Sequence, residues 1–166
     1  WERGLGAPNY SVTRAVVARS KKQLEQVHVC LGTPACRQSD PARFAIYVMN
    51  TVLGGSMSSR LFQNIREKRG LVYSISSGVS AYADTGVFTI YAATSLDSVR
   101  EVLRLTVDEV RRMVDDRLPD DELRRANGGN LVDRRYCMTR ADVARVHAVV
   151  VEVLAAQVAR FVADEP

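Results

Sequence analysis

Cysteine and histidine, the usual ligands of structural zinc sites, are few in this chain of 166 residues. They are three cysteines and two histidines, namely Cys30, Cys36, Cys137, His28 and His147. The cysteines form no Cys-x-x-Cys pair, and the histidines form neither His-Glu-x-x-His nor His-x-x-Glu-His, the helical zinc signatures. His28 and Cys30 would share one face of a strand, but a zinc site typically needs three or four protein ligands. We therefore predict no metal site and no bound cofactor in this chain, with His28 a half-buried strand residue and His147 a packing or surface residue.

The basic character of the chain does not by itself indicate a nucleic-acid partner. The formal net charge is +4, and the isoelectric point is about 9.2. Arginines are mixed with acids between Asp108 and Arg117, as is typical of a solvated helix face, and no aromatic platform or nucleic-acid-binding motif accompanies them. We expect no nucleic-acid partner. The alternative, a nucleic-acid binder, predicts an affinity for DNA or RNA that falls steeply with salt.

The odd number of cysteines argues against a disulfide framework, so we expect a reducing compartment, the cytoplasm. No apolar run reaches the roughly 18 residues of a membrane-spanning helix, and no signal-peptide pattern opens the chain. The chain begins with Trp1 instead of methionine, from which we expect a fragment or a processed product.

The local signals that could position a site are strongest between Leu53 and Ser74. Gly54 and Gly55 permit a tight turn, which we favour over a phosphate-binding loop, and Ser56 or Ser58 can cap the first turn of a helix. Gly70 follows two cationic residues, as is typical of a helix end. Between these signals, helical spacing predicts a short amphipathic helix whose buried face is made by Met57, Leu61, Phe62 and Ile65.

The remaining patterns predict further strands and helices around this stretch. Alternation of period two predicts strands at residues 71–80 and 86–94, which form an antiparallel pair. Similar patterns predict a hairpin of strands at 12–19 and 25–31, followed by a loop at 32–39. Helical spacing predicts helices at 40–53, 95–114, 119–128 and 139–161, the first of them apolar on nearly all sides and therefore packed between two layers.

This order of elements predicts an α+β domain. We expect an antiparallel or mixed sheet of about four to six strands, with helices packed on one face. Residues 1–10 indicate a lead-in or linker, and residues 11–166 a single domain.

The stretch Ile65-Arg66-Glu67-Lys68-Arg69-Gly70-Leu71-Val72-Tyr73-Ser74, read with its flanks, resembles the second domain of the pitrilysin and insulinase-type zinc metallopeptidases. Mitochondrial processing peptidase and its bacterial relatives belong to this family, and the bacterial members are the most similar. The resemblance covers roughly residues 12–114 and includes the segments 25–32, 53–62, 84–88 and 91–95, in that order.

The resemblance implies that this chain is the carboxyl-terminal, zinc-free half of such a peptidase. In the family, two α+β halves close around an extended peptide, and the first half carries His-x-x-Glu-His and the zinc ion. The implied partners are therefore a zinc-bearing first domain or subunit and a peptide substrate. An arginine and a tyrosine of the second half, matched here by Arg66 and Tyr73, are thought to hold the scissile carbonyl region.

The resemblance thus implies a part in the proteolysis of peptides or unfolded segments by a zinc-dependent endopeptidase, with this chain inactive by itself. An alternative is a non-catalytic peptide-recognition or scaffold subunit, since some family members have lost the zinc signature. From the residue types alone, Arg66 could equally be a surface arginine beside Phe62, and Tyr73 a core tyrosine that shares a strand face with Leu71 and Ile75. The segment at 127–138 does not follow the family pattern.

Overall fold

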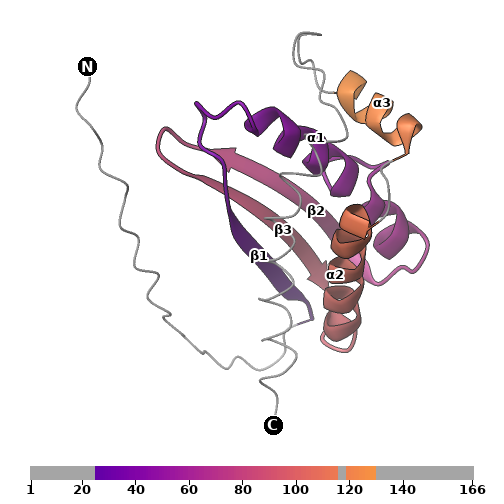
Figure 1. Cartoon of the computed structure of the whole chain (residues 1–166). Helices are drawn as coiled ribbons and strands as arrows, with labels where there is room; N and C mark the ends of the chain where they lie inside the picture. The colour runs from indigo at the N-terminus through magenta and orange to yellow at the C-terminus, as the bar shows by residue number, and fades with distance from the viewer. Residues whose placement is uncertain (1–24, 116–118, 130–166) are drawn as a thin grey trace.

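The computed structural model describes residues 25–115 and 119–129 of the chain (Figure 1). The elements formed by these residues are β1 (Val27–Ala35), α1 (Arg43–Leu53), the π-helix η1 (Phe62–Glu67), β2 (Val72–Ala81), β3 (Gly86–Thr94), α2 (Val99–Asp115) and α3 (Asp120–Gly129). An antiparallel sheet and helices combine in this part of the chain, which confirms the predicted α+β class. The lead-in at 1–10, the strand at 12–19, most of the segment at 127–138 and the helix at 139–161 lie outside the described residues.

β3 is the central strand of the sheet and pairs antiparallel with β1 on one side and β2 on the other (Figure 1). The predicted antiparallel pairing of β2 with β3 is confirmed. The predicted loop is wrong for Gly32–Ala35, because these residues stay in register with β3 and extend β1. Pairing with a neighbouring strand outweighs the low strand propensity of glycine and proline here. The described sheet has three strands, fewer than the expected number.

The hydrophobic core lies between one face of the sheet and the helices (Figure 1). Phe88 and Ile90 of β3 are almost fully buried, as are Met49 of α1, Ile65 of η1 and Val110 of α2. α1 contacts β2 on one side and α3 on the other, which confirms that it packs between two layers. Within the described part of the chain, no helix has the length and apolar character needed to cross a bilayer.

The predicted amphipathic helix forms, but as a π-helix. The Lys68 N–H donates to the carbonyl of Gln63, five residues earlier, at 3.1 Å, which is the wide turn of this helix type. Leu61 and Ile65 are fully buried, as predicted, whereas Met57 is 71% exposed. The prediction is wrong for Met57 because this residue precedes the helix, in the turn that follows α1.

Gly70 ends η1 as the sequence predicts, with a left-handed φ of 63°. Its N–H donates to the carbonyl of Arg66 at 2.9 Å, and the Leu71 N–H donates to the carbonyl of Ile65 at 3.2 Å. These bonds satisfy carbonyl groups that a helix end leaves without partners. They also connect η1 to β2 through a short, well-bonded turn.

We expect Gly70→Ala to lower the free energy of unfolding by about 1 kcal/mol, because an alanine there must adopt the left-handed conformation. A Cβ at this position would meet no atom within 4 Å, so backbone strain is the only added cost. Gly32→Ala is the matched control, since its Cβ would also meet no atom within 4 Å and its φ is not positive. Urea denaturation measures both variants, and equal losses of stability would contradict the strain assigned to Gly70.

Candidate functional site

Arg66 lies in the last turn of η1 with its side chain exposed. Its guanidinium carbon is 4.7 Å from the ring centroid of Phe62, one turn earlier, in a cation–π contact. The preceding residue, Ile65, is fully buried, so consecutive residues of η1 face the core and the solvent. Among residues 25–115 and 119–129, no acceptor is hydrogen-bonded to this guanidinium, and its N–H groups can therefore bind a ligand.

Tyr73 is the extra residue of a β-bulge at the start of β2. Val72 pairs with Thr94 and Ser74 pairs with Ala93, so that one residue of β2 has no partner of its own on β3. The Tyr73 side chain is 58% exposed, whereas Val72 is 6% exposed. The alternative of a core tyrosine is therefore wrong, because the bulge removes Tyr73 from the buried alternation.

The connection between η1 and β2 fixes the backbone on which both residues lie. On the η1 side, the carbonyl of Arg66 accepts the Gly70 N–H. On the β2 side, the hydroxyl of Thr94, a fully buried residue, donates to the carbonyl of Leu71 at 2.6 Å. The structure thus presents a cation and a phenolic O–H on either side of one tight turn. Such groups can stabilise negative charge that develops on a carbonyl oxygen.

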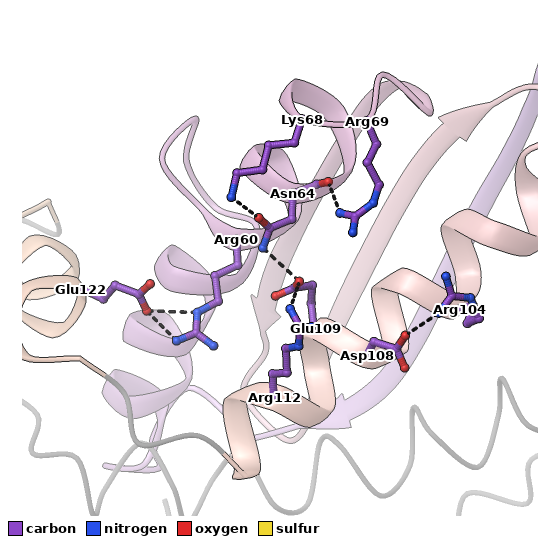
Figure 2. A network of polar contacts seen from close by, with 9 residues as sticks. All are labelled: Arg60, Asn64, Lys68, Arg69, Arg104, Asp108, Glu109, Arg112 and Glu122. Atoms are coloured by element: carbon purple, nitrogen blue, oxygen red, sulfur yellow. Dashed lines mark hydrogen bonds and ion pairs between the residues drawn. The ribbon is translucent and has the colours of Figure 1, made fainter.

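Side chains of α2 and α3 hold η1 and the turn before it in place (Figure 2). Arg60 donates from Nε and Nη2 to Oε2 of Glu122 on α3, at 3.0 and 2.8 Å. Asn64 donates from Nδ2 to Oε1 of Glu109 on α2 at 3.0 Å, and Arg112 donates to the same oxygen at 3.2 Å. Polar contacts therefore tie η1 to α2 and the turn before it to α3, in addition to the apolar packing.

Sequence reasoning missed these polar contacts, although Glu109 offered a signal. It lies between Thr106 and Met113 on the apolar stripe of α2, at a position where helical spacing predicts a buried residue. Glu109 is 5% exposed. A carboxylate in such a place needs hydrogen-bond donors from a neighbouring element, because burial without them is costly.

Of the candidate metal ligands, His28 and Cys30 lie on the face of the sheet opposite the described helices. His28 is exposed, not half-buried, and its Nδ1 is 2.8 Å from the hydroxyl of Tyr91. Cys30 lies on β1, where it pairs with Tyr91 of β3, and it is also exposed. The described residues include no group of three or more His, Cys, Asp or Glu side chains that could hold a metal ion. Cys137 and His147 lie outside the described residues.

A small cavity of about 120 Å³ lies between α1, α3 and the turn after α1. It is lined by Thr51, Val52, Ser56, Ser58, Glu122, Arg125 and Ala126. Neither Arg66 nor Tyr73 lines it, and the carboxylate of Glu122 is already paired with Arg60. The cavity is therefore separate from the candidate site.

Comparison with protein families gives a match over most of the chain. Residues 6–128 match the model described as the peptidase M16 inactive domain. An uncharacterized zinc protease of Streptomyces coelicolor is 48% identical over 107 residues, which are 64% of this chain and 23% of that protein. One from Mycobacterium tuberculosis is 37% identical over 126 residues, or 76% of this chain and 28% of that protein. The chain thus spans only about a quarter of the length of these relatives.

Solved structures show the same fold. A peptidase M16 inactive domain from Pseudomonas fluorescens superposes with a TM-score of 0.61 at 24% identity, over 86% of this chain and 36% of that one. An inactive peptidase domain from Bordetella parapertussis gives a TM-score of 0.60 at 16% identity, over 84% of this chain and 91% of that one. At these identities the likeness establishes the architecture and no residue role.

We expect Cys36 to be alkylated several-fold more slowly than Cys30 at about pH 8, because the thiolate is the reactive form. Burial raises the pKa of the Cys36 thiol, and the nearby carboxylate of Asp40 raises that pKa further, so less thiolate is present at a given pH. Cys30 is exposed. Mass spectrometry after timed treatment with iodoacetamide measures both rates, and equal rates would contradict the described environment of Cys36.

Proposed function

Because the chain belongs to the peptidase M16 family and matches its inactive carboxyl-terminal domain, we propose that it is the zinc-free half of a zinc-dependent endopeptidase. In this role it supplies substrate-binding and carbonyl-stabilising groups to a zinc site carried by another domain or subunit. The observation that carries the proposal is the exposure of both Arg66 and Tyr73, on either side of the Gly70 turn.

The chemistry of these two side chains suits the hydrolysis of a peptide bond. Negative charge grows on the carbonyl oxygen when water attacks the carbonyl carbon, and preorganised donors near that oxygen lower the barrier. The Arg66 guanidinium stays charged at any working pH, and a neutral Tyr73 donates one hydrogen bond. The packing of Arg66 on Phe62 and the bulge at Tyr73 orient the donors before a substrate binds.

The zinc ion belongs, in this proposal, to the partner domain. The described residues of this chain offer no ligand set for it, and the relatives named as zinc proteases are about four times as long as the matched segment. When bound there, zinc supplies Lewis-acid polarisation and an activated water molecule. The substrates are peptides or unfolded segments, because an extended chain can reach a site shared by two domains.

We also propose a cytoplasmic location for the chain. Cys30 and Cys36 are free thiols, which a reducing compartment preserves. Cell fractionation with an antibody to the chain tests this, and recovery outside the cytoplasm would contradict it.

Arg66→Ala and Tyr73→Phe should each lower kcat/KM by about 10²-fold, because each removes a donor to the developing oxyanion. The measurement is cleavage of a fluorogenic peptide by the enzyme assembled from this chain and the matching zinc-bearing half. Arg104→Ala is the matched control, since Arg104 is an exposed arginine on α2 that pairs with Asp108 at 3.0 Å. Its removal should change kcat/KM less than twofold.

Full activity in both the Arg66 and Tyr73 variants, with the two halves still assembled, would remove the catalytic assignment. The chain would then fit the alternative of a non-catalytic peptide-recognition or scaffold subunit.

By itself, the chain should neither bind zinc tightly nor cleave peptides. Isothermal titration with zinc and a peptide cleavage assay test this, and the assembled enzyme is the positive control for both. A submicromolar zinc site in the isolated chain would overturn the division of roles between the halves.

A further inference from the structure

The π-helix that carries Arg66 needs support from outside itself. The π-helix is an uncommon helix type, and η1 has only six residues. A helix this short is not stable alone. Its apolar anchors, Leu61 and Ile65, fix the face that points inward. They do not fix the end of η1, from which Arg66 projects.

Asn64 makes polar contacts on both sides of the last turn of η1 (Figure 2). Its amide nitrogen donates to Glu109 at 3.0 Å, and its amide oxygen accepts from Nζ of Lys68 at 2.9 Å. Its backbone carbonyl accepts from Nη1 of Arg69 at 2.7 Å. One residue thus joins α2, the middle of η1 and the two cations that precede Gly70.

A side-chain amide suits this position because it carries both a donor and an acceptor. Its nitrogen faces the carboxylate of Glu109 and its oxygen faces the ammonium group of Lys68, so these neighbours determine the amide orientation. An aspartate at position 64 would place two carboxylates together. Glu109 is 5% exposed, and such a contact is poorly screened there.

We propose that Asn64, held by Glu109, is a positioning residue that sets the direction of the Arg66 side chain. This inference rests on the proposed function of Arg66 as a carbonyl-binding group. Asn64 does not touch the substrate. It acts by keeping the last turn of η1 in one conformation, on which the placement of the guanidinium depends.

Asn64→Asp should lower kcat of the assembled enzyme about tenfold, with KM changed less than twofold. The double variant Asn64→Asp/Glu109→Gln should recover activity to within about threefold of the parent, because donor and acceptor are exchanged and the bond is kept. Hydrogen exchange of amides 62–70 should accelerate in the single variant and return toward the parent rate in the double variant.

The matched control is Asn50→Asp on α1. Asn50 accepts from the Ser77 hydroxyl through Oδ1 at 2.7 Å, and aspartate keeps that acceptor. This variant should leave both kcat and the exchange of amides 62–70 unchanged.

Combining Asn64→Asp with Arg66→Ala distinguishes a positioning role of Asn64 from a general loss of stability. In the Arg66→Ala protein, adding Asn64→Asp should lower kcat by less than a further twofold, because the side chain that Asn64 positions is absent. A full tenfold loss in that background, or no loss in the parent, would overturn the role of Asn64. Unchanged activity of Arg66→Ala itself would instead overturn the role proposed for Arg66, on which this inference rests.

Discussion

The burial of Ile65 in the common core is the contact on which the candidate site depends. Ile65 is fully buried among residues of α1, α2 and the sheet, so η1 cannot rotate without exposing it. The next residue, Arg66, must then face outward. The buried aliphatic side chain thereby turns the following cation toward the solvent, where its guanidinium lies over the ring of Phe62.

Two features of the backbone keep Arg66 and Tyr73 out of the core. On η1 this feature is helical geometry, which turns the side chains of Ile65 and Arg66 in different directions around the helix axis. On β2 it is the bulge, which adds Tyr73 to one strand without a partner on the other. Both act within a few residues of Gly70, so the turn between them is part of the site although its glycine has no side chain.

The sequence predicted those parts of the fold that local periodicity determines. The ends of β2, β3 and α3 lie within two residues of their predicted positions, because strand alternation, turn residues and helix-end signals agree there. The extension of β1 to Ala35 depends on pairing with β3, and the bulge at Tyr73 depends on the register between β2 and β3. Neither is a local property, so the sequence pattern could not reveal them.

The site itself was predicted through a resemblance, and the structure adds what the residue types left open. Two alternatives for Tyr73 differed in burial, and its 58% exposure excludes the core position. For Arg66, exposure fits either a surface or a binding role, so the difference depends on what orders the guanidinium. Phe62 orders it from one side, and the Asn64–Glu109 bond orders the turn that carries it. Such ordering matters for the role proposed for Arg66, because a donor to a carbonyl oxygen acts best when it is held in one direction before the substrate binds.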